Sequence, residues 1–522
     1  MFLLQASTTA LFDVADLKLI APELILTICA CVALVMEVLL PHRQSRWTGY
    51  FALIGLALAA VSVFVLGWPL LTGADTTALT GFYNTVKVDG FAVVFKLIFI
   101  LSAALTVAIS LRYLDVEGEQ RGEYYALVLF ATVGMMFLSS GYDLIVLFVS
   151  LELMALSFYV LVGFAKRERQ SNEAGMKYFL LGAFSSGILL YGMSLLFGVA
   201  GSTNLGAIAP QVAKAVAAAP DMAGAGVRPM ILLAMIALAA GLFFKIAAVP
   251  FHMWAPDAYQ GAPTSITAFL STGSKAASFA LYARIFVEAL GAMRVDWAPL
   301  LGLVAAITIM VGNWAAVTQT NSKRLLAYSS VSNAGYLLLG LVAANQYGYT
   351  GLVVYLVVYT FMNIGAFGVI ISLRRRGVIG DEVEDFTGLG QKEPGMALMM
   401  AIFMLSLGGL PVTGGFIGKW FLFGGVFQRG ATEGKSWYYW LAGWAALNTV
   451  VSFYYYVRFI RAMYIGDRVA DERPLSMSPA LSAALVVCAV AVVFIGVYPH
   501  PLIKAAEAVI SALAPGGSVA LR

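Results

Sequence analysis

Apolar runs of about 18 or more residues recur along the whole chain, and this repetition restricts the possible folds more than any other feature. Only 11% of the 522 residues are charged, against about 25% in a soluble domain, and the mean hydropathy is +0.87. The alternating ten-residue pattern of a membrane β-barrel is absent. The sequence therefore predicts an all-α membrane protein.

We expect about 14 transmembrane helices, because each run is long enough to cross a hydrocarbon core about 30 Å thick. The expected spans are 19–40, 47–68, 90–111, 123–140, 143–165, 173–200, 229–255, 262–289, 297–317, 323–344, 348–373, 395–428, 437–464 and 477–498.

The connections between the spans predict an orientation. If the N-terminus is outside, most basic residues of the connections fall on the inner side, among them Arg46, Lys166 and the run 374–376. Lysine and arginine are enriched in inner connections. An even number of spans then places both termini outside.

Several kinds of cofactor site are not indicated. Cys29, Cys31 and Cys488 lie in apolar runs, as buried small hydrophobic residues do. No CxxC, HExxH, P-loop or complete GxGxxG pattern occurs, so nothing argues for a metal, an iron–sulfur cluster or a dinucleotide in this chain. The net charge of +4 is small and dispersed, which argues against a nucleic-acid partner.

Ionisable residues inside the spans are the candidates for function, because a charge in the bilayer centre is expensive. Glu152 lies about 14 Å into its span and Lys275 about 20 Å into its own, so both fall in the middle third. Lys96, Lys177 and Arg284 lie nearer span ends. For these three we expect snorkelling or structural ion pairs.

Two stretches resemble each other at a distance in the chain. "AAVPFHMW" at 247–254 resembles "GGLPVTGG" at 408–415, and both place a proline within a span. Spans 4–8 and 9–13 then form two repeats of five helices, and the second repeat is inverted because five is odd. Inverted repeats with broken helices are typical of secondary transporters. The predicted domains are an N-terminal three-helix segment 1–121, the first repeat 122–290, the second repeat 291–466, and helix 14 with its tail 467–522.

Each proline break has a lysine nearby, Lys245 before the first and Lys419 after the second. Burial weakens a lysine's hold on its proton, and a carboxylate 4 Å away opposes this by about 4 kcal/mol at an effective dielectric constant of 20. Glu152 is the deep carboxylate available to Lys245. A change in their separation would switch the lysine between holding and releasing a proton, so we predict a relay from Glu152 and Lys245 through Lys275 to Lys419.

Other polar residues are less specific. His252 follows Lys245 by seven residues and is either a proton shuttle or a structural histidine. A polar patch in span 10 occupies the place of span 5 in the second repeat, where Ser329 aligns with Glu152. The patch comprises Tyr328, Ser329, Ser330, Ser332 and Asn333.

Long stretches of the chain are similar to one known family. "SLELMALSFYVLVGF", "KIAAVPFHMWAPDAYQGAPTSITAFLSTGSKAASFALY", "NSKRLLAYSSVSNAGYLLLG" and "LSLGGLPVTGGFIGKWFLF" resemble the antiporter-like membrane subunits of bacterial respiratory complex I, the NADH–quinone oxidoreductase. The resemblance extends over about residues 19–498. Lys419 stands where subunit M has a glutamate, and the long C-terminal amphipathic helix of subunit L is missing.

The resemblance implies a proton-translocating subunit that couples quinone reduction to proton pumping without redox chemistry of its own. Glu152, Lys245, Lys275 and Lys419 match the family's proton-channel residues, and helices 7 and 12 are expected to be broken. NADH, FMN, the iron–sulfur clusters and the quinone are expected on other subunits, so no cofactor is expected here. The expected surroundings are subunits K and M, the lateral helix of L, and lipid of the bacterial inner membrane, with both termini periplasmic.

Two alternatives remain at this point. A membrane subunit of a cation/proton antiporter would use the same relay with an ion gradient as the driving force. A structural scaffold would tolerate the loss of the deep lysines.

Overall fold

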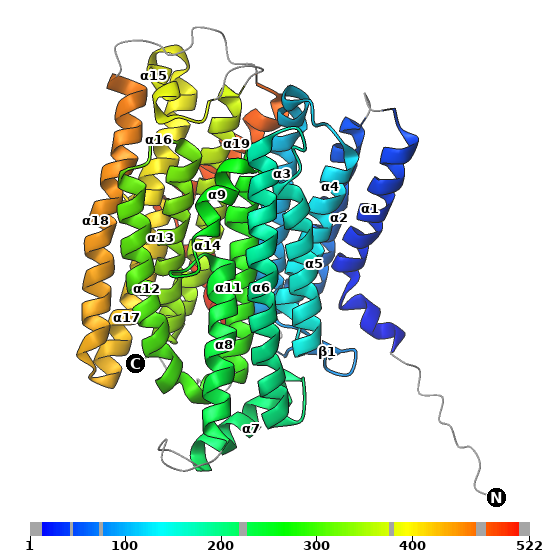
Figure 1. The fold of residues 1–522 in the computed structure, drawn as a ribbon, viewed down its shortest axis with the longest axis vertical. Coiled ribbons are helices and arrows are strands. Elements are labelled where there is room, and N and C mark those ends of the chain that lie inside the picture. Colours follow the sequence, from blue (N-terminus) through cyan, green and yellow to red (C-terminus); the bar gives the residue numbers. More distant parts are fainter. Residues whose placement is uncertain are drawn as a thin grey trace, which may run out of the picture.

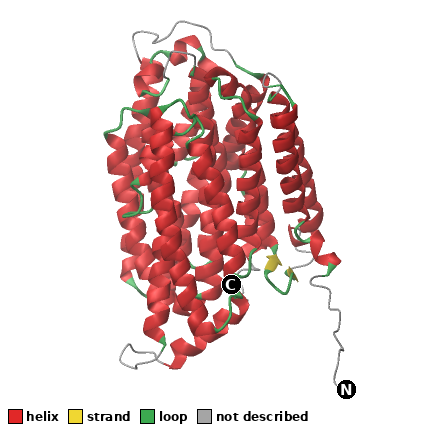
Figure 2. Cartoon of the chain, turned by 45° about the vertical axis from the view of Figure 1, so that its right-hand side comes forward, coloured by secondary structure: helices red, strands yellow, loops and turns green. Residues whose placement is uncertain are grey.

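Long, nearly parallel helices form a single bundle, seen in two views of the computed structural model (Figures 1 and 2). The structure describes residues 13–41, 45–71, 77–218, 227–374, 380–465 and 477–510. The strands β1 (Leu79–Gly81) and β2 (Val86–Val88) pair antiparallel at one end of the bundle, here named the hairpin end. The helix α15 (Leu389–Lys392) lies at the other end, named the α15 end.

The bounds of the first part of the chain are η1 (Val14–Lys18), α1 (Ala21–Leu39), α2 (Arg46–Leu71), α3 (Gly90–Glu117), α4 (Gly122–Ser140), α5 (Leu144–Val162), α6 (Arg169–Ala200), α7 (Leu205–Ala218), α8 (Arg228–Ile246), α9 (Trp254–Gly261), α10 (Thr264–Phe269), η3 (Leu270–Ser274), α11 (Lys275–Tyr282), η4 (Ala283–Ala289) and η5 (Gly291–Met293). The remaining helices are α12 (Arg294–Val317), α13 (Ser322–Ala343), α14 (Gln346–Leu373), η6 (Val383–Phe386), α15, α16 (Pro394–Gly408), α17 (Gly414–Glu433), α18 (Ser436–Ile465), α19 (Pro479–Val497) and α20 (His500–Ile510).

The predicted number of membrane crossings is confirmed. Within the described ranges, eleven helices are long and apolar enough to cross a membrane. Three further crossings are the segmented run from α10 to η4, the pair α16 and α17, and the 30-residue α18, which brings the number to 14. Backbone polar groups in lipid must be satisfied within the segment, which is why every crossing is helical.

Helices 7 and 12 are broken, as predicted. Ala247, with φ of 58°, ends α8, and Gly409, with φ of 82°, ends α16. Pro250 and Pro411 follow within the two breaks and cannot donate a backbone hydrogen bond. The chain resumes helical structure at Trp254 and at Gly414.

Burial follows position in the bundle. About nine-tenths of the apolar core of α13 and α14 is buried, whereas only 33–39% of that of α1, α2 and α19 is buried. Figure 1 shows α1 and α18 at opposite edges of the bundle. Exposed leucine and valine side chains on the outer helices suit contact with lipid or with neighbouring subunits.

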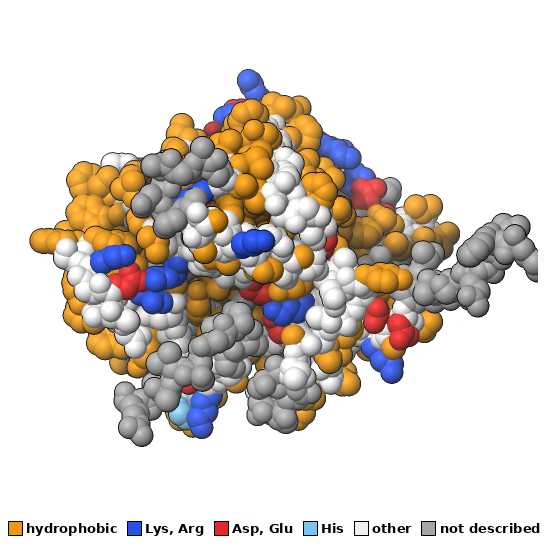
Figure 3. Space-filling view, turned by 90° about the horizontal axis from the view of Figure 1, so that it is seen from below, with side chains coloured by type: hydrophobic (Ala, Val, Ile, Leu, Met, Phe, Trp, Pro, Cys, Tyr) orange, Lys and Arg blue, Asp and Glu red, His pale blue; other side chains and the backbone are white. Residues whose placement is uncertain are grey.

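Charged residues concentrate at the two ends. Seen from the hairpin end, basic and acidic side chains lie next to one another while hydrophobic side chains form most of the rim (Figure 3). Arg375 and Arg376, used for the predicted orientation, lie outside the described residues, as does the predicted domain boundary at 466–467.

The elements outside the predicted spans include the β1–β2 hairpin, α7 within the connection 201–228, α15 and the short α20. Gly81 packs on Asp16, and Val509 of α20 packs on Gly90 at the start of α3. The two ends of the described chain therefore both lie at the hairpin end, which agrees with an even number of crossings.

Candidate functional site

Lys245 lies in the last turn of α8, directly before the first break. Its side chain is only 5% exposed, and its Nζ has no hydrogen-bond partner among the described residues. The rings of Tyr159 and Phe244 lie 5.8 and 5.9 Å from this Nζ, measured to the ring centres. Aromatic faces attract a cation but do not accept its proton, so Lys245 has no direct proton acceptor in this conformation.

Glu152 on α5 is close enough to Lys245 for an electrostatic interaction, but no ion pair joins them in the described structure. The side chain is half-buried and its Oε1 lacks a hydrogen-bond partner within the described residues. Tyr159 lies two helical turns further along α5, and its hydroxyl is also unpartnered there. Water can bridge polar groups that do not meet directly, so proton exchange here requires water or a movement.

Lys275 begins α11, immediately after the π-helical turn η3. Such turns inside α-helices are frequent at functional sites. Its side chain is 2% exposed. The Nζ donates to the backbone carbonyl of Ser330 and, over 2.5 Å, to the Ser330 Oγ. The Tyr259 hydroxyl lies 3.3 Å from the same Oγ, so Lys275 joins a chain of hydroxyl groups.

Side chains of α13 form a second polar cluster in the core of the second repeat, beginning with Ser329, the residue before Ser330. The Ser329 Oγ lies 2.5 Å from the Tyr456 hydroxyl and accepts a 3.3 Å hydrogen bond from Asn333 Nδ2. Tyr355 donates to Asn333 Oδ1 over 2.6 Å. Tyr336, three residues after Asn333, lies on a neighbouring part of the same helix face. These groups come from α13, α14 and α18.

Lys419 lies beside this second cluster, on α17 beyond the second break. It is 3% exposed, and its Nζ lies 4.7 Å from the centre of the Tyr336 ring. The Nζ donates to the Leu407 carbonyl over 2.9 Å. Leu407 is in the last turn of α16, where the helix dipole favours a cation. Lys419 therefore bridges the two halves of helix 12.

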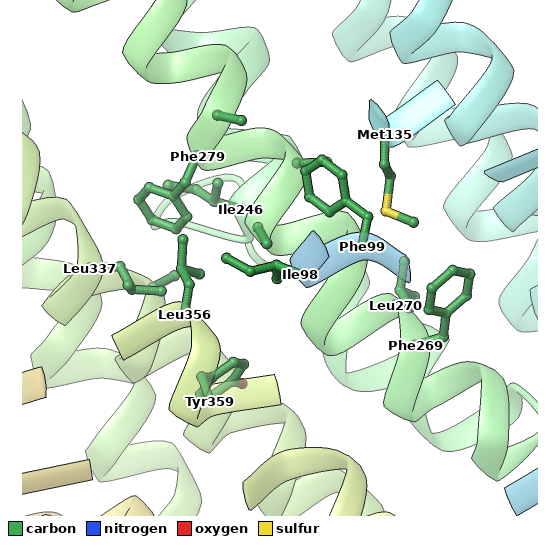
Figure 4. Close-up of a cluster of buried hydrophobic side chains, with 14 of the residues drawn as sticks. Ile98, Phe99, Met135, Ile246, Phe269, Leu270, Phe279, Leu337, Leu356 and Tyr359 are labelled. Atoms are coloured by element: carbon green, nitrogen blue, oxygen red, sulfur yellow. The ribbon is translucent and has the colours of Figure 1, made fainter. Parts of the chain in front are cut away.

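A cluster of buried hydrophobic side chains includes neighbours in sequence of two of the lysines (Figure 4). Ile246, the residue after Lys245, and Phe279, one turn after Lys275, both belong to it. Tyr359 lies at its edge, with its ring centre 5.9 Å from Lys275 Nζ. The two lysines thus lie in surroundings of low polarity, where electrostatic interactions are stronger than in water.

His252 does not share these surroundings. It is half-buried in the first break, between the exposed side chains of Phe251 and Met253, and its Nδ1 has no partner among the described residues. Tyr328 of the predicted polar patch is only half-buried. In the described part of the chain no group of three or more His, Cys, Asp or Glu residues could hold a metal ion.

The charges nearer the span ends form ion pairs, as predicted. Lys96 pairs with Glu23 over 2.6 Å, and Arg284 pairs with Asp89 over 2.7 Å, with all four side chains buried. Lys177 pairs at the surface with Glu173 and Asp257. Sequence reasoning missed the tyrosines of the site. Their presence within apolar spans was the available signal: Tyr159, Tyr259, Tyr336, Tyr355, Tyr359 and Tyr456.

Comparisons with known proteins agree with this architecture. A family model described as NADH:quinone oxidoreductase/Mrp antiporter, TM, matches residues 141–443. The subunit N 2 of NADH-quinone oxidoreductase from Solibacter usitatus is 47% identical, and the alignment covers 94% of this chain and 96% of that protein.

Solved structures of membrane complexes contain chains with a similar fold. A chain of respiratory complex I from Thermus thermophilus with bound aureothin superposes with a TM-score of 0.75 at 33% identity, covering 93% of this chain and 99% of that one. A chain of the Mrp complex from Dietzia reaches a TM-score of 0.79 at 20% identity, covering 95% and 98%, and shows a shared fold alone. With the lysine in helix 12 and the near full-length match to subunit N, the chain belongs to the NADH-quinone oxidoreductase subunit N family of antiporter-like membrane proteins.

Proposed function

We propose that this chain is a proton-translocating membrane-arm subunit of an NADH–quinone oxidoreductase, and that Glu152, Lys245, Lys275 and Lys419 relay the protons. The observation that supports this most directly is the set of three lysines, each at most 5% exposed, at the two helix breaks and beside the π-helical turn. Within the described structure, none of the three forms an ion pair that would hold its charge permanently.

In this mechanism each lysine alternates between the ammonium and the neutral amine. When Glu152 approaches Lys245, the ammonium is stabilised; when the two separate, the proton is released towards Lys275. From Lys275 the hydroxyl groups of Ser330 and its neighbours on α13 lead towards Lys419. The two breaks interrupt helices 7 and 12, so the half-helices on either side can move. Backbone groups freed at the breaks need polar partners, and water can supply them.

Quinone reduction takes place elsewhere in this proposal. NADH, FMN, the iron–sulfur clusters and the quinone belong to other subunits, and this chain contributes no redox step. Subunits K and M and the lateral helix of L are the proposed neighbours. The apolar outer faces of α1, α2 and α19 supply surface for such contacts and for lipid.

The proposed location is the bacterial inner membrane, with the α15 end on the cytoplasmic side. Arg46, Lys166 and Arg374 belong to the connections at that end, in keeping with the excess of basic residues in cytoplasmic connections. The hairpin end, where both ends of the described chain lie, is then periplasmic.

A direct test is the Lys245→Ala variant of the whole complex in native membranes, with the quinone reductase rate and proton pumping recorded together. We expect both rates to fall by about tenfold or more in assembled complex, because a positioned proton carrier contributes at least this much. Lys166→Ala, at an exposed lysine of the α15 end, is the matched control.

Two outcomes would contradict the proposal. Normal rates in assembled Lys245→Ala complex would remove Lys245 from the relay. Pumping that persists in washed membranes without quinone turnover, driven by a sodium or potassium gradient, would identify an antiporter instead.

A further inference from the structure

A small depression of about 60 Å³ opens at the α15 end, between the end of α3 and the starts of α10 and α13. Its lining is rich in ionisable and polar side chains, including Glu117, Arg374, Asp381, Tyr113, Gln260 and Lys323. Arg374 pairs with Glu117 over 2.7 Å and with Asp381 over 3.0 Å, which keeps this wall polar. Water from the α15 side can therefore reach the floor of the depression.

Lys323 connects this depression with the protein interior. It lines the depression, yet its side chain is only 3% exposed. The Nζ donates a 2.9 Å hydrogen bond to the Ala262 carbonyl, at the C-terminal end of α9. Lys323 is thus a buried cation with one face towards water and one towards α9.

Lys323 and the groups that bind Lys275 contact the same helix, α9. Lys323 and Ser330 lie seven residues apart on α13, so they occupy the same helix face about 10 Å apart along the axis. Both contact α9: Lys323 meets Ala262, and Ser330 meets the hydroxyl of Tyr259. The Ser330 Oγ in turn accepts the 2.5 Å hydrogen bond from Lys275.

We propose that Lys323 is the proton-uptake residue of this subunit, which transfers protons from the polar depression at the α15 end to Lys275. This inference rests on the proposed relay and identifies the residue through which protons enter it. In each transfer the Lys323 ammonium releases one proton towards the Tyr259–Ser330 hydroxyls and becomes a neutral amine. Lys275, neutral beforehand, gains one proton. The Lys323 amine is then reprotonated from water in the depression.

A purely structural role for Lys323 makes a different prediction. A cation beside the C-terminal carbonyls of α9 stabilises that helix through the helix dipole. Arginine performs this function as well as lysine, but it does not give up its proton in proteins. Histidine can exchange a proton near neutral pH. The arginine and histidine variants therefore separate the two roles.

The experiment compares Lys323→Arg, Lys323→Met and Lys323→His in the intact complex in native membranes, with Lys166→Arg as control. Assembly, quinone reductase rate and proton pumping are measured for each. We expect Lys323→Arg to assemble but to pump about tenfold less or worse, like Lys323→Met, and Lys323→His to retain a measurable part of the pumping.

Normal pumping in Lys323→Arg would overturn the inference and make Lys323 a structural residue. If Lys323→Arg does not assemble, pumping by Lys323→His that is no better than that by Lys323→Met would overturn it. Lys275→Met, measured in parallel, distinguishes an error in the relay as a whole from an error in the uptake role of Lys323. If Lys275→Met pumps normally, the relay itself is wrong. If Lys275→Met fails while Lys323→Arg is normal, only the uptake role of Lys323 is wrong.

Discussion

At the scale of single residues, the three relay lysines differ in what holds them. Lys275 has two oxygen acceptors on Ser330, Lys419 has the Leu407 carbonyl, and Lys245 has aromatic rings but no acceptor in the described structure. Hydrogen bonds to a charged group contribute about 1.5–3 kcal/mol each. The charged form of Lys245 is thus supported by Glu152 and the aromatic rings rather than by a hydrogen bond, which suits a residue whose proton is released when Glu152 moves away.

The hydroxyl of Ser330 gives a test at this scale. Ser330→Ala removes the Oγ acceptor of Lys275 and the link to Tyr259, but leaves the Ser330 carbonyl in place. We expect pumping to fall by roughly tenfold, corresponding to the loss of one hydrogen bond to a charged group, while assembly is retained. Ser194→Ala, at an exposed serine of α6, is the control, and equal activity of the two variants would contradict the expectation.

At the scale of elements, each broken helix must bring two half-helices into close contact. In helix 12, Gly415 lies so close to α16 that a Cβ there would approach the Ser406 carbonyl oxygen to 1.9 Å. Its backbone N–H also donates to the Ser406 Oγ over 3.1 Å. This contact fixes α17, and with it Lys419, against the end of α16.

Gly415→Ala should therefore separate the two half-helices. We expect a destabilisation of about 1–3 kcal/mol, typical of overpacking, together with reduced pumping because Lys419 loses its position at Leu407. Thermal unfolding of the purified complex measures the first effect. Gly424→Ala on the same helix meets no heavy atom within 4 Å, so it should be neutral or slightly stabilising. The prediction is wrong if both variants melt alike.

At the scale of the whole molecule, the buried charged residues fall into two groups, one that forms ion pairs and one that consists of the relay lysines. Paired charges join segments far apart in the sequence, as Arg284 of η4 does with Asp89 before α3, and both of these side chains are completely buried. Lysines that form no ion pair with the described residues occupy the breaks and the π-helical turn. The ion pairs therefore hold the bundle together, and the lysines remain free to exchange protons.

Breaking the buried pair should cost far more than breaking a surface pair. Arg284→Met leaves the buried Asp89 with only the more distant Lys87, at 3.5 Å, as a cation in the described structure, and we expect a loss of about 3–5 kcal/mol or failure to assemble. Adding Asp89→Asn should recover part of this loss, because asparagine can still cap α3. Arg46→Met breaks a pair with Asp115 whose side chains are 56% and 32% exposed, so about 0–1 kcal/mol is expected. The yield and the melting temperature of the complex measure these losses. Equal losses for Arg284→Met and Arg46→Met would contradict the expected difference between the buried pair and the surface pair.

The sequence by itself determined the crossings, the two breaks and the deep positions of Glu152, Lys245, Lys275 and Lys419. Hydropathy reports directly on the membrane, which admits only helices, and a proline in the middle of a span removes a backbone hydrogen bond, as at Pro250 and Pro411, whereas Pro69 near the end of α2 leaves that helix continuous. Only the tertiary structure decided which polar groups meet. Ser330 reaches Lys275 across 55 residues of chain, Tyr456 reaches Ser329 across 127, and Lys323 is buried against Ala262 although it begins its helix. Such meetings depend on the packing of distant segments, and a local pattern of hydropathy holds no information about that packing.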